Sequence, residues 1–351
     1  MTSKERIRTV LERRTPDRVP STMQCVETAW EKLKNYYSVD STDAVQDILD
    51  IDTRIMDLPP YIGPEHPPFV NAEGETEYTH PLGYRYVNKW NGVEYNWHMV
   101  YYPLGHIETW EQYEAFDGWT DPDWFDYSAV KDFCDRHEGR AIRIGWPGPY
   151  QVFTMLYPAE KFYMLMVDEP ELVQAMLKKY CDISLEIYRR MFEAAGDRVD
   201  ILRCCDDYGT QRGLLFGPEM WDEFFAENTK RFVALAHEHN CYYLQHSCGA
   251  IRGIIPNMIR CGVDCIEPIQ KVVGLEADGL KKDFGDRLCF QGGVDTQGVL
   301  PFGTPAQVRE ETERIIRALS PGYILAPSQD FEGDVPVENI AALYEARKSF
   351  L

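Results

Sequence analysis

The sequence predicts a single α/β domain over residues 1–351, built as a (β/α)8 or TIM barrel, and three observations lead to that fold class. Short apolar segments alternate with amphipathic helical patterns from about residue 140 onward, which is typical of parallel βαβ units. Polar residues follow those segments at the predicted strand ends, where a barrel would gather them. No GxGxxG or phosphate-binding loop follows the first strand, which disfavours a doubly wound sheet.

The elements are expected in the following order. A first helix over SKERIRTVLERR (3–14) ends at the Thr15-Pro16 pair, and VPSTMQ (19–24) and DTRIM (52–56) are the early strands. Later strands are predicted at 141–145, 199–205, 241–246, 263–268, 287–292 and 323–327. Helices are predicted at 171–196, 218–239, 251–262, 304–319 and 337–350, several of them with Pro near the start and Gly at the end.

Residues 54–128 interrupt this alternation. They are rich in Pro, Gly, Tyr and Trp, and they contain short alternating pieces such as YRYVNKW (84–90) and GVEYNWHMVYYP (92–103). Such pieces are typical of small antiparallel strands or long loops. The segment is therefore expected to form a loop-rich insertion that caps the barrel together with the N-terminal helical extension.

The acidic composition excludes several kinds of partner. The chain carries 57 acidic against 36 basic residues, a net charge of −21, which argues against nucleic acid or an anionic membrane as partner. It also disfavours a polyanionic small substrate. The sequence has no apolar run long enough to span a membrane and no secretory pattern at its start, so its ten cysteines are expected to be reduced thiols in a cytoplasm.

Polar residues follow the predicted strands at the point where each strand ends. The carboxyl ends of barrel strands surround one opening, so side chains far apart in the sequence are expected to meet there. This convergence predicts an active site at that face. The residues in these positions are Trp146, Tyr150, Asp206, Asp207, His246, Cys248, Glu267, Gln270, Gly292, Gly293, Asp295, Ser328, Gln329 and Asp330.

His246 and Cys248 form an H-x-C pair directly after the strand at 241–246, and three interpretations are open. The pair holds a metal ion, acts as a thiol nucleophile with its base, or is a buried histidine beside an idle cysteine. Zinc needs three or four ligands, and carboxylates on neighbouring strand ends favour the metal. The nucleophile is least favoured, because side chains two apart on an extended segment share a face as ligands.

Five stretches of the sequence resemble the uroporphyrinogen decarboxylase superfamily, and together they extend over nearly the whole chain. This resemblance implies a single (β/α)8 barrel. The stretches are ERIRTVLERRTPDRVP, DDYGTQRGLLFGPEMWDEFF, LQHSCGAIRGIIPNMIRCGVDCIEPIQ, LKKDFGDRLCFQGGVDTQGVLPFGTPAQV and YILAPSQDFEGDVPVENIAALYEA.

The superfamily has two branches with different chemistries. The decarboxylases take a polycarboxylated porphyrinogen on an N-terminal stretch close to RQAGR, which this sequence lacks. The corrinoid-dependent methyltransferases hold zinc on a His-x-Cys pair and a later cysteine, and His246 and Cys248 match that pair. The resemblance and the net charge together favour the methyltransferase branch, with zinc as the expected metal and the corrinoid supplied by a partner protein.

The third zinc ligand is where the sequence departs from this pattern. The loop after the last strand reads APSQDFEGD, with Ser328 or Gln329 where the thiol-methylating members carry cysteine. Glu267 is the expected third ligand, and Asp330 is chemically acceptable too. Fewer thiolates leave a more electrophilic zinc, which suits activation of an ether or hydroxyl oxygen.

The expected activity is transfer of a methyl group from a small methylated donor, such as an aryl methyl ether in O-demethylation, to the Co(I) corrinoid of a partner protein. Asp206 and Asp207 are the catalytic candidates, as acids on the leaving oxygen, although they also suit helix capping. The alternatives are transfer from a methylcobamide to an acceptor, a decarboxylase, and a tetrapyrrole carrier. The resemblance also implies a homodimer. The substrate-binding candidates are Trp146, Tyr150, Gln211 and Gln329, with the aromatic segment 80–102.

Overall fold

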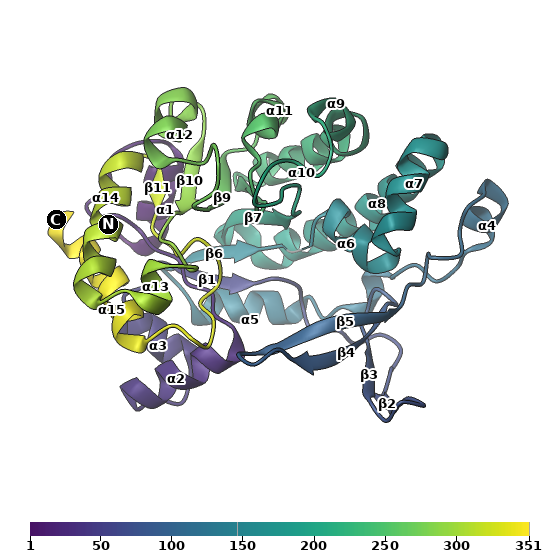
Figure 1. Cartoon of the computed structure of the whole chain (residues 1–351), viewed down its shortest axis with the longest axis horizontal. Coiled ribbons are helices and arrows are strands. Elements are labelled where there is room, and N and C mark those ends of the chain that lie inside the picture. Colours follow the sequence, from purple (N-terminus) through teal and green to yellow (C-terminus); the bar gives the residue numbers. More distant parts are fainter. Residues whose placement is uncertain (146, 351) are drawn as a thin grey trace.

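The computed structural model describes residues 1–145 and 147–350, and its centre is a curled sheet of seven parallel strands (Figure 1). Every connection from β6 to β11 contains a helix, as parallel neighbours require. The strands, in sheet order, are β1 (Thr53–Met56), β6 (Ala141–Ile144), β7 (Val199–Cys205), β8 (Tyr242–His246), β9 (Cys265–Ile269), β10 (Cys289–Gly292) and β11 (Tyr323–Ile324).

Seven of the eight predicted strands are confirmed, and β11, the last of these along the chain, is only two residues long. The remaining predicted strand, residues 19–24, makes single bridges in place of a regular ladder. Ser21 bridges Leu325 in parallel, and the Leu325 amide donates to the Pro20 carbonyl at 2.8 Å. On its other side, the Asp52 amide donates to the Ser21 carbonyl at 3.0 Å. Backbone hydrogen bonds thus connect this segment to residues beside both edge strands.

Helices surround the sheet and fill its connections (Figure 1). The N-terminal helix begins with a capping box between Thr2 and Glu5, the local signal that starts it. The α-helices are α1 (Ser3–Leu11), α2 (Glu27–Tyr37), α3 (Thr42–Ile48), α4 (Trp110–Ala115), α5 (Ser128–Arg136), α6 (Pro149–Leu156), α7 (Ala159–Asp168), α8 (Pro170–Ala195), α9 (Pro218–Trp221), α10 (Glu227–Glu238), α11 (Ile255–Cys261), α12 (Ala277–Phe284), α13 (Val299–Phe302), α14 (Pro305–Leu319) and α15 (Val337–Ala346).

The helix predicted at 218–239 is interrupted by a wider, π-helical turn over Asp222–Ala226 that separates α9 from α10. Phe224, Phe225 and Ala226 are consecutive and all buried. A regular α-helix turns successive residues about 100° apart, so it does not face three neighbours to one core, and a wider turn changes that spacing. The apolar periodicity predicted the helical segment and not this local widening.

A second sheet of four antiparallel strands lies within the 54–128 segment: β2 (Phe69–Val70), β3 (Thr76–Thr79), β4 (Arg85–Trp90) and β5 (Tyr95–Tyr101). The small sheet extends from the main body at the lower right of Figure 1. Stacked rings hold its strands, as with Tyr86 and Trp97, whose centroids are 4.6 Å apart. The boundary at residue 54 was wrong by a few residues, because β1 occupies Thr53–Met56 in the main sheet.

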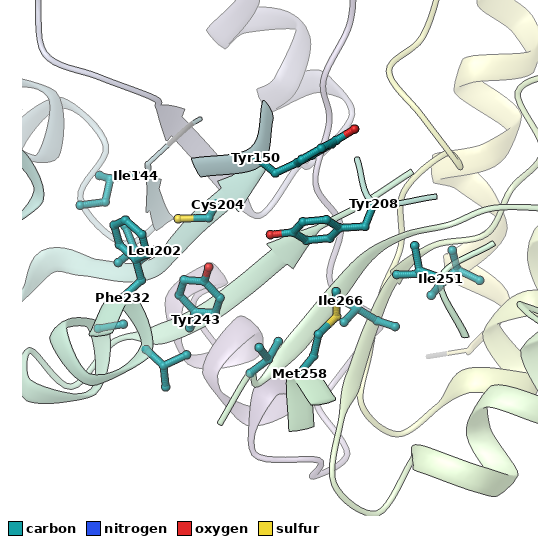
Figure 2. Packing of buried hydrophobic residues seen from close by; sticks show 14 of the residues in the cluster. Ile144, Tyr150, Leu202, Cys204, Tyr208, Phe232, Tyr243, Ile251, Met258 and Ile266 are labelled. Atoms are coloured by element: carbon teal, nitrogen blue, oxygen red, sulfur yellow. The ribbon is translucent and has the colours of Figure 1, made fainter. Parts of the chain in front are cut away.

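Strand residues alternate between two cores, as the pleat requires. Ile144 and Leu202 pack with ring-bearing residues and helices in the larger core (Figure 2). Ile201 and Leu244 pack with Ile7 of α1 in a smaller one. This second core also takes the first residues of several strands, so α1 covers the amino end of the sheet and leaves the carboxyl end for polar residues.

Among the described residues, no helix has both the length and the apolar character needed to cross a membrane.

Candidate functional site

His246 ends β8 and lies at the centre of a polar cluster. Its Nε2 is 3.3 Å from Asp207 Oδ1 and 3.5 Å from Cys248 Sγ. The Cys248 amide donates to the same Asp207 oxygen at 2.9 Å, which fixes the loop after β8 to the loop after β7. The imidazole is 6% exposed. The structure therefore brings together three residues that the strand-end argument selected.

Cys205 completes the donor set. It is the last residue of β7 and the direct ladder partner of His246 in β8. The Cys205 sulfur, an Asp207 oxygen and a His246 ring nitrogen all lie within 4.8 Å of one another. Sequence reasoning missed Cys205, although the signal was present: it immediately precedes Asp206 and Asp207 where a strand meets the predicted site.

Two glycines let the loops carrying these residues approach closely. Gly249 has φ of +86°, and a Cβ there would come 2.3 Å from the Gly209 backbone. The chain therefore places glycine directly after Cys248 because a side chain has no room at this crossing. The Gly249 amide also donates to Gln270 Oε1 at 2.7 Å, so Gln270 holds the same loop.

The other face of the imidazole contacts a buried ion pair. His246 Nδ1 lies 3.3 Å from Glu267 Oε1 and 2.6 Å from an Arg203 nitrogen. Glu267 pairs with the Arg203 guanidinium and also accepts from the Gln291 amide. Glu267, predicted as a zinc ligand, thus faces the imidazole nitrogen directed away from Asp207 and Cys248.

The charges in this cluster depend on one another. Burial opposes the ionised forms, yet the pKa of Asp207 is lowered to about 2 by its hydrogen bond to His246. Burial also opposes the imidazolium, but Cys205 and Asp207 hold the pKa of His246 well above its ordinary value. Burial raises the pKa of the Cys248 thiol, and His246 partly offsets this effect. The cluster favours a bound positive charge.

Gln329 reaches the cluster from the loop after β11. Its Nε2 donates to Cys248 Sγ at 3.1 Å. Its neighbours serve other contacts: the Ser328 hydroxyl accepts a hydrogen bond from the Thr296 amide at 3.1 Å, and desolvation raises the pKa of the half-buried Asp330. The last loop therefore touches the thiol of the H-x-C pair with an amide where the resemblance implies a cysteine.

Asp206 has a different environment from Asp207. It is 1% exposed, and the Gln151 amide donates to its Oδ1 while the Tyr208 hydroxyl donates to its Oδ2, each at 2.9 Å. Gln151 lies in the first turn of α6, so Asp206 caps that helix from another element. A Cβ on Gly148, the residue before α6, would come 2.1 Å from Asp206. Burial raises the pKa of Asp206 to about 7.

Tyr150 belongs to an aromatic core. It is 4% exposed, its ring centroid is 5.3 Å from that of Tyr208, and its hydroxyl is 2.5 Å from that of Tyr163 (Figure 2). It does not line the cavity beside Cys248. The other aromatic candidate, Trp146, lies outside the described residues.

A cavity of about 520 Å³, here called the mouth cavity, opens beside Cys248 and Gln329. Gln211 lines it, as predicted for a substrate-binding residue, together with Gln270. The expected aromatic pocket of residues 80–102 corresponds to a much smaller apolar cavity of about 30 Å³ between His80, Leu82 and α8. Of these two cavities, only the one at the strand ends has room for a small molecule.

Comparisons with known proteins show which chains this one resembles. The sequence pattern of the uroporphyrinogen decarboxylase (URO-D) family matches residues 125–350. Two curated relatives, both methylcobamide:CoM methyltransferases MtaA of Methanosarcina barkeri, one from strain Fusaro (DSM 804), are 25% identical over 210 residues. The match covers 59% of this chain and 57% of each relative, so the chain spans little more than half of their length.

A solved structure, a methyltransferase from Methanosarcina mazei, superposes with a TM-score of 0.71 at 18% identity and covers 100% of this chain and 99% of that one. Fold and site define an α/β protein with a candidate metal centre at the carboxyl ends of its parallel strands. The chain belongs to the uroporphyrinogen decarboxylase family, because the family pattern covers well over half of it. The relatives found carry methyltransferase names.

Proposed function

We propose that this protein is a corrinoid-dependent methyltransferase that moves a methyl group from a small methylated donor to the Co(I) corrinoid of a partner protein. The observation that carries the proposal is the cluster of Cys205, Asp207 and His246 beside the mouth cavity of a URO-D family chain. The relatives named as methylcobamide methyltransferases support it.

The proposed scaffold is a closed (β/α)8 barrel in which residues 19–24 are the eighth strand. Their backbone bonds to Leu325 on one side and Asp52 on the other support this closure. The second sheet is proposed to cap the barrel mouth. Its β4–β5 turn approaches the last loop, since a Cβ on Gly333 would come 3.3 Å from the Val93 carbonyl.

Zinc fits the donor set of the cluster. It binds nitrogen, sulfur and carboxylate oxygen at about 2.0–2.3 Å, and donors within 4.8 Å of one another can surround one ion. We propose His246 Nε2, Cys205 and Asp207 as ligands, with Cys248 as a fourth. Glu267 then takes the supporting role of fixing the imidazole through Nδ1, because its oxygens already bind Arg203 and Gln291.

In the reaction, the bond from the methyl carbon to its heteroatom breaks, a bond from carbon to cobalt forms, and the leaving heteroatom keeps the electron pair. A bound zinc supplies a Lewis acid that draws electrons from that heteroatom. The side chain of Asp207 is 40% exposed, and we assign its carboxylate to holding the metal ion. Asp206 is buried with both oxygens engaged, so we assign it to positioning the loop.

An aryl methyl ether is the proposed donor. The mouth cavity falls within the roughly 300–1,000 Å³ typical of small-molecule sites, so it has room for one aromatic ring. Gln211 and Gln329 offer amide groups that orient the donor's polar substituents. The corrinoid reaches the methyl group through the same opening, on a separate partner protein.

The test is to mix the zinc-loaded protein with a reduced corrinoid protein and a panel of methoxylated aromatics. We expect methyl-cobalt absorbance with at least one donor, and its loss in the His246→Ala variant. The matched control is His66→Ala, at an exposed histidine just before β2, and this variant is expected to keep the activity. Absence of methyl-cobalt with every donor, at verified zinc content, would refute the proposal.

A second candidate is transfer from a methylcobamide to a thiol acceptor, because the curated relatives carry that activity in their name. The two thiols near His246 are compatible with it. Incubation with methylcobamide and a panel of small thiols separates the two directions: thioether formation favours this candidate. A homodimer and a cytoplasmic location remain predictions.

A further inference from the structure

The charged groups of the mouth cavity are mostly acidic. Asp295, Glu332 and Asp334 line it, and Lys271 is the one basic residue among its described lining residues. The Lys271 ammonium lies 3.7 Å from Asp295 Oδ2, so these two opposite charges partly offset each other. Glu332 and Asp334 remain as two carboxylates at the opening.

Further carboxylates gather at the same opening. Burial and the charges of Glu332, Asp330 and Asp334 raise the pKa of Glu94, which lies in the β4–β5 turn of the second sheet. The pKa of Glu332 is raised as well, by burial and then by Asp334 and Asp330. These carboxylates come from two separate segments of the chain, and together they make the electrostatic potential at the cavity opening negative.

Two buried arginines of the main sheet are engaged with other groups. Arg203 pairs with Glu267 and lines a separate cavity of about 20 Å³ beside His246. Arg143, 1% exposed, donates to Gln24 and lies 3.4 Å from Asp57. Neither arginine lines the mouth cavity, so within the described chain it offers a carboxylate no guanidinium to bind.

The remaining polar lining is neutral. Thr210, Gln211, Thr296 and Gln297 present hydroxyl and amide groups, which donate to and accept from uncharged partners. Such groups suit phenolic and alcoholic hydroxyls and ether oxygens. The lining therefore combines neutral hydrogen-bonding capacity with a field that repels anions.

We infer that the mouth cavity selects a methyl donor without an anionic group, and that Glu332 and Asp334 are the specificity-determining residues that exclude carboxylated donors. That the ligand is a methyl donor rests on the proposed function, whereas the selectivity rests on the residues that line the cavity. Its substrate class is the neutral methoxyphenol, with guaiacol as the simplest probe.

A matched pair of ligands tests the selectivity. Vanillyl alcohol and vanillate have the same ring, methoxy and phenol groups and differ in a neutral hydroxymethyl against a carboxylate. Calorimetry on the zinc-loaded protein without corrinoid is expected to show vanillyl alcohol binding roughly fivefold or more tightly than vanillate. The difference narrows as salt is raised, because exposed charges are screened. Equal or tighter binding of vanillate would overturn the inference.

The double variant Glu332→Gln with Asp334→Asn tests the assignment. Vanillate binding is expected to improve roughly fivefold, with vanillyl alcohol unchanged. Asp286→Asn is the matched control, because that carboxylate is 77% exposed in the loop before β10, at the amino end of the sheet. An unchanged ligand ratio in the double variant overturns the assignment. Methyl transfer to Co(I) is measured in parallel: no turnover with any donor counts against the proposed function, while the binding ratio still decides the inference.

Discussion

Cys205 of β7 and His246 of β8 are direct partners in the parallel ladder, and their sulfur and ring nitrogen lie within 4.8 Å of each other and of Asp207. Ladder partners on parallel strands point to the same face. The register of two buried strands therefore builds the candidate metal centre, and only Asp207 and Cys248 come from loops.

Replacing Cys205 with alanine is expected to weaken zinc binding at least tenfold, because one of the clustered donors is removed. Cys204→Ala is the control, since its side chain points to the opposite face and packs in the larger core (Figure 2). Zinc affinity is measured by competition with a chromophoric chelator. Equal affinity in wild type and Cys205→Ala would exclude Cys205 as a ligand.

Glu267→Gln is expected to lower the free energy of unfolding by about 3 kcal/mol, because it leaves the Arg203 charge buried without its carboxylate. Urea denaturation of the two proteins measures the change. Glu276→Gln, at an exposed position before α12, serves as control. A loss below about 1 kcal/mol would show that Arg203 finds another partner or water.

Gly148→Ala is expected to destabilise the protein by about 1–3 kcal/mol, because the added methyl would overlap the Asp206 carboxylate. Gly213→Ala is the matched control, as a Cβ there meets nothing within 4 Å. Thermal unfolding compares the two variants. Equal melting temperatures would mean that the Asp206 carboxylate, which caps α6, shifts away from the added methyl group with no loss of stability.

His80 predicts a pH dependence of stability. Burial lowers its pKa to about 4 from the ordinary 6.5. The folded state thus binds fewer protons than the unfolded one between these values. The neutral, buried His80 therefore contributes at most about 3 kcal/mol to the free energy of unfolding. This contribution is fully present above pH 6.5 and is lost as the pH falls toward 4. Unfolding measured across that window tests it.

The variant His80→Asn keeps a polar side chain without the titration, so its stability is expected to fall less over the same pH window. His66→Asn, at an exposed position, keeps the wild-type profile. Parallel profiles for wild type and His80→Asn would show that other groups account for the acid sensitivity.

Sequence periodicity was sufficient for the main sheet, because buried parallel strands are short, mostly apolar segments such as VDILRCC, which is interrupted only by Asp200 and Arg203. The grouping of Asp207, His246 and Cys248 followed from strand ends meeting at one face. The place of Cys205 at a strand end could be seen in the sequence, but its pairing with His246 required the β7–β8 register. Tyr150 was expected in a substrate pocket and lies in an aromatic core, because helix α6 turns its ring inward.

The second sheet was predicted as an insertion that caps the barrel, but its spatial relation to the last loop was not predicted. That relation depends on long-range contacts such as Val93 with Gly333, separated by more than two hundred residues of sequence. The same is true of Glu267, whose role depends on Arg203 and Gln291 of neighbouring strands.

The proposed zinc ion is held by sulfur, nitrogen and oxygen donors of β7, β8 and their loops. X-ray absorption at the zinc edge of the loaded protein detects these ligands. We expect one ion per chain with mixed ligation and zinc–sulfur distances of about 2.3 Å, and we expect its loss in His246→Ala. A zinc surrounded by oxygen alone, or one unaffected by that substitution, would contradict this assignment.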